Sequence, residues 1–339
     1  MPIPLRKDRE AHNLDPALTA HLKDIIPSSR LMLPTVILQL LYAVEQSGDY
    51  LRDAGSVTQS QTGNAFGDTQ LNVDIATENL IRQALSRCPN VVTASSEEDH
   101  IERSVEHEAG SLPLEGSTDE RYAVAFDPLD GSSIIGANWT VGAIIGIWDG
   151  DTALGQNPRE KQVVSILGVY GPRTTAIVAI RFPGAEPACF EVALTSKLSV
   201  LSKKSVNLSE GPFKTKYFAP ANLRSAADSP QYAALVNHYL TNKYTLRYSG
   251  GLVPDVVHAL VKGHGVYVSP VTATSKAKLR RLFELCPVAM VVECAGGKAV
   301  GSEDGEDVLA KAINNTEETG GLICGNVEEV DFAIKSLLG

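Results

Sequence analysis

Cysteine is scarce along this chain and its spacing suggests no pairing. The 339 residues include five cysteines, and no two of them stand as Cys-x-x-Cys. An odd, widely spaced set is unlike the framework of a disulfide-stapled secreted domain. Disulfides persist in oxidising compartments and are rare where thiols are kept reduced. We therefore expect a reduced, intracellular protein. The cysteines are Cys88, Cys189, Cys286, Cys294 and Cys324.

Long hydrophobic runs are also missing. No stretch reaches the ~18 consecutive apolar residues that a membrane-spanning helix needs. The segment 1–10 has no apolar signal core and includes Asp8 and Glu10, which is unlike a secretory signal or a transit peptide. These absences predict a protein without a membrane partner and, as the default compartment, the cytoplasm.

Positive charge is in the minority. The chain has 30 Lys and Arg against 40 Asp and Glu, a formal net charge of −10, and no stripe of basic residues. This balance argues against nucleic acid as a partner. The overall field of such a chain also repels an anionic substrate. Bound metal ions and a few basic side chains would have to reverse the sign of the potential at a site for an anion.

The chain does have an ordinary globular composition, with 43% hydrophobic and 21% charged residues. Apolar positions recur with helical spacing over 31–53 and 73–87, and the small, polar stretch 54–66 is typical of a mobile loop. Later segments alternate between strand-like runs rich in Val, Ile and Tyr and helical patterns. We expect strands at 122–126, 141–148, 162–170, 174–182 and 264–269, and helices at 230–241, 250–262 and from Pro287 to just before Gly296.

This order of helices, then strands, then helices and strands predicts layered α/β packing. The pattern is interrupted near residues 203–213, by Lys203-Lys204-Ser205 and Glu210-Gly211-Pro212. A boundary there divides the chain into an N-terminal domain, 1–208, and a C-terminal α/β domain, 209–339.

The most informative stretch is Phe126–Ser133, which reads Phe-Asp-Pro-Leu-Asp-Gly-Ser-Ser. Asp127 and Asp130 stand three residues apart at the end of an apolar run, and a Gly-Ser-Ser turn follows. Carboxylate oxygens are ligands for hard divalent metals, and small turns with N–H and hydroxyl groups cradle phosphate. Together they indicate metal-assisted phosphate hydrolysis. By spacing alone, Asp-Pro-Leu-Asp-Gly also fits a plain turn.

Three other acidic groups attract attention but are ambiguous singly. Asp68, which precedes the helix containing Asp74, fits an ordinary helix cap. The run 97–99, Glu-Glu-Asp, fits a solvated charge cluster. Glu284 stands alone before Cys286-Pro287. Spacing leaves these alternatives open.

The chain resembles the fructose-1,6-bisphosphatase family of Mg-dependent, lithium-sensitive sugar phosphatases, through motifs that occur in the same order along nearly its whole length. The residues that carry this resemblance are Phe126–Ser133, Gly67-Asp68 with Asp74, Ser96-Glu97-Glu98 and Lys278–Glu284. Within the family, the chain is most similar to the sedoheptulose-1,7-bisphosphatases, through Leu31–Pro34, Tyr170–Thr175, Phe218–Arg224 and Tyr244–Asp255. The resemblance implies an α/β (α+β) fold, a layered α-β-α-β-α sandwich of the sugar phosphatase type.

The resemblance also implies a metal site and the residues that prepare the attacking water. Two or three Mg²⁺ ions, for which Mn²⁺ could substitute, would be bound by Glu97, Asp127, Asp130, Glu284 and the Leu129 carbonyl. Asp68 and Glu98 would orient the water or a loosely held metal, and Asp74 would help take its proton.

For the substrate, a sugar bisphosphate, the resemblance implies two phosphate subsites. Gly131, Ser132 and Ser133 would bind the 1-phosphate that leaves. The distal phosphate and the sugar would be bound by Asn222, Arg247, Tyr248 and Lys278. Arg247 would reach in from a neighbouring subunit, which implies a homodimer or homotetramer.

These residue types suit the chemistry. Phosphate monoester hydrolysis is among the slowest uncatalysed reactions, and its transition state spreads negative charge over several oxygens. Metal ions held about 4 Å apart by carboxylates can stabilise that charge. Arg contacts a second phosphate through its planar fork, and Lys supplies a point charge. In the absence of the resemblance, Arg247 fits a surface ion pair and Lys278 a solvated side chain.

Some positions depart from the family pattern. The segment 54–63 contains none of the regulatory cysteines that chloroplast sedoheptulose bisphosphatases carry there, so we expect no thioredoxin control. The N-terminal segment does not resemble the AMP-binding helix of animal fructose bisphosphatases, so we expect no AMP inhibition. Gly250-Gly251 replaces Gly-Ser after Ser249, which leaves the preferred sugar length open.

The resulting hypothesis is a Mg-dependent hydrolase that releases the 1-phosphate of sedoheptulose 1,7-bisphosphate and leaves sedoheptulose 7-phosphate. The nearest alternative is a fructose-1,6-bisphosphatase or a dual-specificity enzyme, because one hydroxymethylene unit discriminates weakly. An inositol- or nucleotide-phosphate phosphatase is disfavoured by Arg247 and Lys278, which suit a second phosphate. A non-catalytic sugar-phosphate-binding regulator is disfavoured because every expected carboxylate is present.

Overall fold

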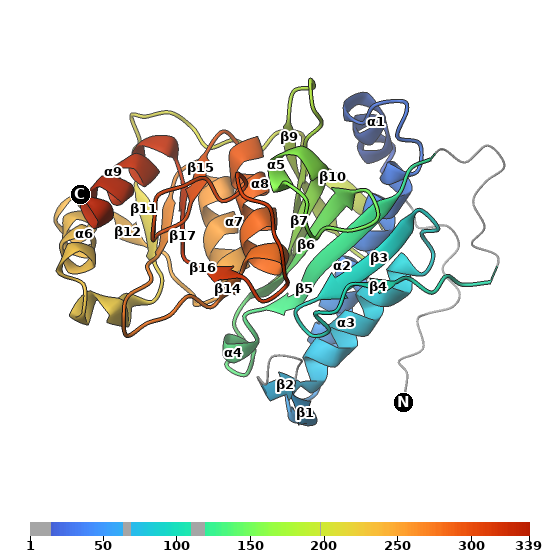
Figure 1. Cartoon of the computed structure of the whole chain (residues 1–339), viewed down its shortest axis with the longest axis horizontal. Coiled ribbons are helices and arrows are strands. Elements are labelled where there is room, and N and C mark those ends of the chain that lie inside the picture. The colour runs from blue at the N-terminus through green and yellow to red at the C-terminus, as the bar shows by residue number, and fades with distance from the viewer. Residues whose placement is uncertain (1–14, 64–68, 110–118, 197) are drawn as a thin grey trace.

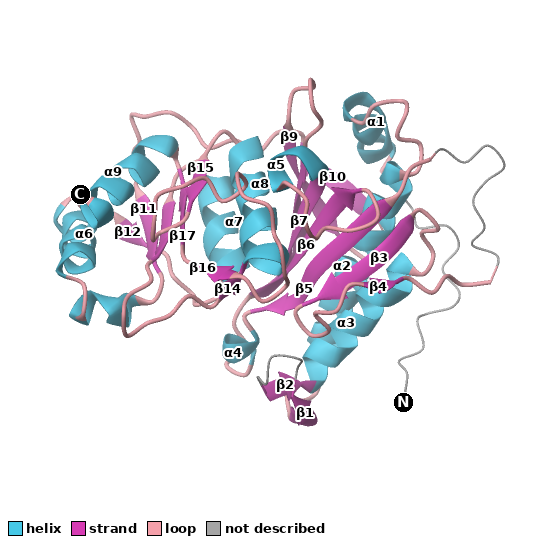
Figure 2. Cartoon of the chain, in the orientation of Figure 1, coloured by secondary structure: helices cyan, strands magenta, loops and turns pink. Residues whose placement is uncertain are grey.

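Two twisted sheets alternate with three helical layers in the computed structural model, which describes residues 15–63, 69–109, 119–196 and 198–339. Helices cover both faces of each sheet, and the order across the molecule is α-β-α-β-α (Figures 1 and 2). This arrangement confirms the layered sandwich that was expected.

The larger sheet has eight strands in the order β10-β9-β8-β7-β6-β5-β3-β4. Only the β3–β5 pair is parallel among these neighbours. Its central strands are apolar on both faces, as a sheet buried between two helical layers requires. The strands are β3 (Val91–Ser96), β4 (Arg103–Ser104), β5 (Tyr122–Asp130), β6 (Val141–Asp149), β7 (Gln162–Tyr170), β8 (Thr174–Ile180), β9 (Ala188–Leu194) and β10 (Ser199–Lys203).

The first helical layer consists of α1 (Pro16–Ile25), α2 (Leu33–Asp53) and α3 (Asn72–Leu85). The apolar stripe of α2 includes Val36, Ile37 and Leu40. It belongs to the core on one face of the large sheet, where α2 contacts β7, β8 and β9. Residues that recur every three or four positions form such a stripe because the helix repeats every 3.6 residues.

The middle layer holds α7 (Leu252–Lys262) and α8 (Cys286–Cys294), between the two sheets. Five consecutive residues of α8, Val288 to Val292, are almost completely buried. A helix that is apolar all round is stable only inside a core. The apolar run after Pro287 therefore predicted this element correctly, with the helix ending before Gly296.

The smaller sheet has the order β12-β11-β13-β17-β15, and its outer face is covered by α6 (Pro230–Thr241) and α9 (Val327–Leu338). Alternation along β11 separates its two faces: Phe218 joins the outer core, whereas Ala219 joins the middle one. The strands are β11 (Tyr217–Pro220), β12 (Thr245–Leu246), β13 (Val266–Ser269), β15 (Lys298–Val300) and β17 (Leu322–Gly325).

Short elements complete the fold. They are the helical turns α4 (Ser132–Ile135), α5 (Pro158–Lys161), η1 (Leu223–Ala227) and η2 (Arg281–Leu285), and the strand pairs β1 (Gln59–Gly63) with β2 (Thr69–Leu71) and β14 (Leu279–Arg280) with β16 (Thr319–Gly320). Strand β1 corrects the predicted loop of 54–66 at residues 59–63, whereas 54–58 are irregular as predicted and 64–66 lie outside the described residues. Gln59 and Ser60 are not among the β-branched and aromatic residues that are enriched in strands. The hydrogen-bonded pairing with β2 stabilises the strand instead.

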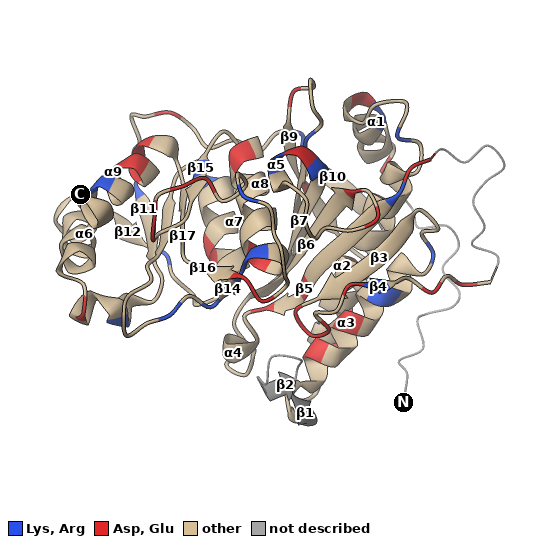
Figure 3. Ribbon diagram, viewed as in Figure 1, with Lys and Arg blue, Asp and Glu red and all other residues tan. Residues whose placement is uncertain are grey.

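Two further observations bear on the sequence-based expectations. Lys and Arg are dispersed among acidic residues over the described elements rather than gathered on one of them (Figure 3). Within the same residues, no helix is both long and apolar enough to cross a membrane. The division of the chain at residue 208 stays a prediction.

Candidate metal centre and active site

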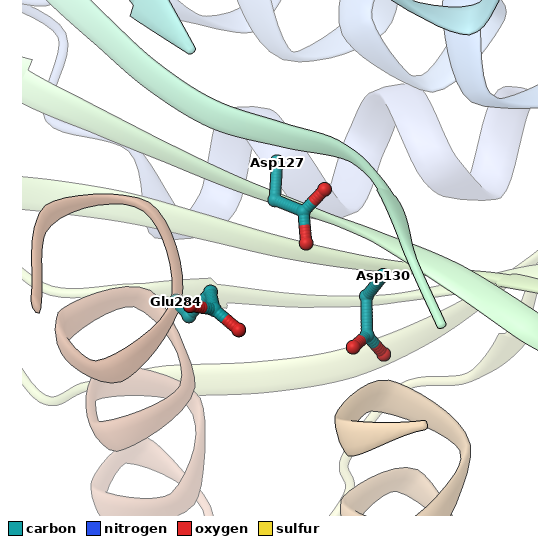
Figure 4. Close-up of side chains that lie close together, drawn as sticks. All are labelled: Asp127, Asp130 and Glu284. Atoms are coloured by element: carbon teal, nitrogen blue, oxygen red, sulfur yellow. The ribbon is translucent and has the colours of Figure 1, made fainter. Parts of the chain in front are cut away.

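Strand β5 delivers the two aspartates of the Phe126–Ser133 stretch. All nine residues of β5 are buried, and its register against β6 shifts between Asp127 and Asp130. In a regular strand, residues three apart face opposite sides of the sheet. The irregularity allows both carboxylates to point into the same space, where Figure 4 shows them converging. The strand thus continues through Asp130, four residues beyond the predicted end.

The carboxylate of Asp130 lies at the N-terminus of α7. Its two oxygens accept the backbone N–H groups of Leu252, at 3.2 Å, and Val253, at 2.6 Å. The first N–H groups of a helix have no intrahelical partner and carry partial positive charge. Asp130 therefore caps α7 from another part of the chain and fixes the helix against the end of β5.

Glu284 reaches the same space from η2, a π-helical turn that leads into α8. Its carboxylate accepts the backbone N–H of Arg280. One oxygen from each of Asp127, Asp130 and Glu284 lies within 4.8 Å of the others, and all three residues are buried (Figure 4). Glu284 therefore stands on an irregular helical turn, as Asp127 and Asp130 stand on an irregular strand. π-turns of this kind commonly occur at functional sites.

Glu97 adds a fourth carboxylate. It follows β3, the parallel neighbour of β5, and its backbone N–H donates to the Phe126 carbonyl at 3.0 Å. The negative charge of Glu97 contributes to raising the pKa of both Asp127 and Glu284, so it lies near both. Parallel strands bring their carboxyl ends to the same edge of a sheet, which explains how residues 97 and 127 meet.

The cluster is electrostatically unfavourable without a cation. Burial, and then the charges of Glu97, Asp130 and Glu284, raise the pKa of Asp127 well above its ordinary value. Burial and Glu97 do the same to the pKa of Glu284. Burial also raises the pKa of Asp130 to about 6, although the N–H groups of α7 oppose the shift. Buried like charges at this spacing need a counterion, and an all-oxygen donor set suits a hard divalent metal.

The predicted phosphate turn follows directly. Gly131 has a φ of 94°, a left-handed conformation that favours glycine, and it precedes the short turn α4. A Cβ added at Gly131 would lie 3.2 Å from Val141 Cγ1 and 3.6 Å from Gly251 Cα, so the backbone is closely packed there. Ser132 and Ser133 are exposed on α4, immediately after the aspartates of the carboxylate cluster.

The structure places two of the three residues that were predicted to prepare the attacking water. Asp74 is buried in the first turn of α3, where it accepts the N–H of Leu71 at 2.7 Å, and burial raises its pKa to about 6. Glu98 is half-buried beside Glu97. Asp68 lies outside the described residues.

The predicted distal residues come from the second half of the chain. Tyr248 is close to Asp255, whose charge adds to the effect of burial in raising the tyrosine pKa, and to the backbone of Asn222. The Asn222 amide donates to the Pro270 carbonyl and to Ser275, at 3.1 and 2.6 Å. Lys278 is exposed and stands two residues before Arg280, the backbone donor to Glu284.

The contacts of Arg247 differ from those of Tyr248. Its guanidinium donates to the Leu246 carbonyl at 2.8 Å and lies 5.7 Å from the centre of the Tyr217 ring. These contacts do not bring Arg247 to the carboxylate cluster of its own subunit. A role in a neighbouring subunit's site therefore stays a prediction.

Two residues near the cluster were not assigned from the sequence. The charge of Arg280 opposes the upward pKa shift of Glu284, so a cation lies beside the carboxylates. Asp255 accepts the N–H groups of Ser249 and Gly250, at 2.7 and 3.2 Å, and thereby shapes the turn after Tyr248. Both stand in the stretches that carry the family resemblance, but nothing in their spacing distinguishes them from neighbouring charged residues.

Comparison with known proteins agrees with this geometry. Residues 29–194 match the family model for the N-terminal domain of fructose-1,6-bisphosphatase, and residues 212–337 match that for its C-terminal domain. The chloroplastic sedoheptulose-1,7-bisphosphatase of Spinacia oleracea is 37% identical over 303 residues, which are 86% of this chain and 72% of the spinach protein.

Solved structures give the same result. A Toxoplasma gondii protein, assigned provisionally as a sedoheptulose-1,7 bisphosphatase, is 33% identical and superposes with a TM-score of 0.82. The holo form of Leishmania major fructose-1,6-bisphosphatase is 25% identical, with a TM-score of 0.80. Each alignment covers 94% of this chain and 97% of the other. From its sequence, its five-layer fold and its carboxylate cluster, the chain belongs to the fructose-1,6-bisphosphatase family of sugar phosphatases.

Proposed function

We propose that the protein hydrolyses the 1-phosphate of sedoheptulose 1,7-bisphosphate in a Mg²⁺-dependent reaction. The observation that carries this proposal is the buried cluster of Asp127, Asp130 and Glu284, with the Gly131–Ser133 turn directly beside it. A cluster of buried carboxylates suits a divalent cation, and the adjacent turn suits the phosphate on which the cation acts. The similarity to the spinach enzyme supports the sugar.

Two or three Mg²⁺ ions, bound by Glu97, Asp127, Asp130, Glu284 and the Leu129 carbonyl, would neutralise phosphate charge and lower the pKa of a water nucleophile. The chain's own residues then orient the substrate. The backbone of Gly131 and the hydroxyls of Ser132 and Ser133 donate to the 1-phosphate and hold it against the carboxylates. Arg280, beside Glu284, supplies positive charge at the same end of the substrate.

Asp74 is the proposed proton acceptor, with Asp68 and Glu98 orienting the water. A general base works best when its pKa is near the operating pH. Burial raises the pKa of Asp74 to about 6, which brings the carboxylate closer to that condition than an exposed aspartate. It remains mostly ionised at pH 7 and holds a proton more strongly than usual once it has accepted one.

The other end of the substrate would lie on Asn222, Tyr248 and Lys278, with Arg247 contributed by a second copy of the chain. Arg247 is exposed, and its contacts with the Leu246 carbonyl and the Tyr217 ring lie away from the carboxylate cluster, which supports this arrangement. A homodimer or homotetramer follows from it, and we propose the cytoplasm as the compartment.

Fructose 1,6-bisphosphate is the second candidate substrate. The Leishmania major fructose-1,6-bisphosphatase has nearly the same TM-score as the Toxoplasma gondii protein, so the fold does not separate the two sugars. Gly250 and Gly251 do not decide between the sugars, since a Cβ at either position would lie 3.4 Å from the Ile134 side chain. The similarity to the spinach enzyme is what favours the seven-carbon substrate.

The test is phosphate release from both bisphosphates by the purified protein, with Mg²⁺ and with EDTA. We expect release that requires Mg²⁺, and a higher kcat/KM for the seven-carbon substrate. A kcat/KM that favours the six-carbon substrate would make the protein a fructose bisphosphatase. Absence of release from both substrates with Mg²⁺ present would refute the enzymatic proposal.

A further inference from the structure

The segment that carries Arg247 and Tyr248 begins at the edge of the small sheet. It follows β12, a two-residue edge strand that pairs in parallel with β11 and with no other strand that the structure describes. The N–H of Thr245 donates to the Lys216 carbonyl at 2.7 Å, and the N–H of Arg247 to the Phe218 carbonyl at 2.9 Å. An edge strand this short has little intrinsic stability, so its position depends on other contacts.

Tyr244, the residue before β12, is tied to the C-terminal helix α9. Its hydroxyl lies 2.8 and 2.9 Å from the two carboxylate oxygens of Glu329. The ammonium of Lys216 lies 3.1 Å from both the Tyr244 hydroxyl and a Glu329 oxygen. The Glu329 side chain is 4% exposed, so the carboxylate that accepts these contacts is buried.

His264 connects the same carboxylate to β11. Its Nε2 lies 3.2 Å from Glu329, and its Nδ1 accepts the backbone N–H of Tyr217 at 3.1 Å. An Nδ1 that accepts must be unprotonated, so Nε2 carries the proton and donates to the carboxylate. Through Tyr244 and His264, Glu329 holds both β12 and its partner strand.

The network is well satisfied for a buried charge. Burial raises the pKa of Glu329, but donors from His264, Tyr244 and Lys216 outweigh it, and the net shift is downward. The Tyr244 ring also packs against Tyr239, with 5.0 Å between centroids. A fully satisfied buried network is rigid, because every alternative arrangement leaves a buried polar group unpaired.

We propose that Glu329, acting through Tyr244, is a positioning residue for substrate binding: it fixes β12 and so places Arg247 and Tyr248 for the distal end of the bisphosphate. This inference rests on the proposed function for its catalytic consequence. Tyr248 lies four residues beyond Tyr244, and Asp255 fixes the turn that follows Tyr248. The segment is therefore held at both ends, by Glu329 on one side and Asp255 on the other.

The decisive variant is Tyr244→Phe, which removes the hydroxyl and keeps the ring. Tyr239→Phe is the matched control, since Tyr239 is buried in the core against which Tyr244 packs and its hydroxyl has no hydrogen-bond partner within the described part of the chain. Glu329→Gln tests the carboxylate and keeps an acceptor for Tyr244. Kinetics are measured on the preferred bisphosphate and on fructose 1-phosphate, which has no distal phosphate. Hydrogen exchange at the amides of Thr245 and Arg247 reports on β12 directly.

For Tyr244→Phe we expect the KM for the bisphosphate to rise about tenfold. A change of this size corresponds to the loss of roughly one buried hydrogen bond to a charged group. kcat and the turnover of fructose 1-phosphate should stay near wild type, and exchange should speed up at Thr245 and Arg247. Glu329→Gln should also raise the KM. Tyr239→Phe should change neither the KM nor the exchange rates at Thr245 and Arg247. An unchanged KM, or a loss shared equally by both substrates, would overturn the inference.

Failure of the proposed function is distinguishable from failure of this inference. If the wild-type protein releases no phosphate from any bisphosphate, the kinetic comparison disappears but the exchange measurement remains. Faster exchange at Thr245 and Arg247 in Tyr244→Phe, but not in Tyr239→Phe, would then support the attachment of β12 through Tyr244 and Glu329 without its catalytic consequence. Unchanged exchange at both amides would refute it whatever the activity.

Discussion

The carboxylate of Asp130 accepts the backbone N–H of Val253 at 2.6 Å, so a candidate metal ligand is also the cap of helix α7. Each carboxylate oxygen has two lone pairs, and one from each remains for a cation. α7 also holds Asp255, which fixes the turn after Tyr248. The end of β5, the start of α7 and the distal-phosphate segment are thus mechanically connected.

This connection predicts the effect of Gly142→Ala. Gly142 pairs with Asp130 across β5 and β6, and a Cβ there would lie 2.5 Å from the Val253 side chain and 2.8 Å from the Gly168 carbonyl. Relief of that clash moves α7 away from Asp130. We expect a loss of about 1–3 kcal/mol in unfolding free energy, together with a loss of phosphate release that persists in the folded fraction. Chemical denaturation and phosphate assays measure the two effects.

Gly55→Ala is the control for this substitution, because a Cβ at Gly55 meets nothing within 4 Å. It should leave activity and stability close to wild type. Wild-type turnover by folded Gly142→Ala would contradict the coupling between α7 and the carboxylate cluster.

Asp127→Asn should abolish most of the activity. The change keeps the size of the side chain but removes one negative charge from the cluster, so we expect phosphate release to fall at least about 100-fold and Mg²⁺ to raise the melting temperature less than in the wild type. Without Mg²⁺, the variant should be more stable than the wild type because a buried like charge is gone. Asp151→Asn, at an exposed ion pair with Arg121, serves as the control. Near-normal turnover by Asp127→Asn would rule out this metal assignment.

The sequence was sufficient for the layered fold because its periodic segments are long. The apolar stripe of 31–53 specifies one helix and its buried face, and the apolar runs 162–170 and 174–182 each specify one strand buried on both faces. It was insufficient for β1, whose small polar residues pair only because β2 lies beside them. The end of β5 was also missed, since the strand runs through Asp-Pro-Leu-Asp, which locally resembles a turn.

The candidate site shows the same division. Spacing identified Asp127 and Asp130 as a pair, but their convergence depends on a register shift that no local pattern encodes. Glu284 and Glu97 were assigned only through the family resemblance, since segments that are distant in the chain meet by folding. Arg280 was missed because nothing in the sequence Lys-Leu-Arg-Arg distinguishes it from its basic neighbours or predicts that it lies beside Glu284.

Asp74→Asn should separate activity from stability. The folded-state pKa of Asp74 is raised by burial from 3.8 to about 6, so its ionised form destabilises the fold above pH 6. The shift corresponds to at most about 3 kcal/mol. In EDTA at pH 7.5, the variant should therefore unfold at a higher denaturant concentration than the wild type, and the difference should shrink as the pH falls from about 6 to about 4, below which Asp74 is protonated in both states. Phosphate release should fall, because the proton acceptor is lost. A variant that is active, or less stable at pH 7.5, would contradict the assignment.

Helix α1 contains a buried histidine without a polar partner. His21 is 5% exposed, neither ring nitrogen has a hydrogen-bond partner among the described residues, and the ring meets Phe190 edge-on with 4.8 Å between centroids. Burial, followed by the charge of Lys204, lowers the pKa of His21 below 6.5. The neutral ring therefore fits the core between α1 and the large sheet, whereas the protonated ring does not.

This arrangement predicts an acid-sensitive attachment of α1. Since the pKa of His21 is lower in the folded state than in the unfolded state, its protonation favours unfolding, and the resulting loss of stability begins as the pH falls below about 6.5. His21→Leu removes the titrating group and keeps an apolar side chain, so its unfolding free energy should decline less than that of the wild type between pH 7 and pH 5. His107→Leu, at an exposed position, should follow the wild type. Denaturant unfolding at several pH values measures the slopes, and equal slopes for wild type and His21→Leu would show that His21 does not control the acid response.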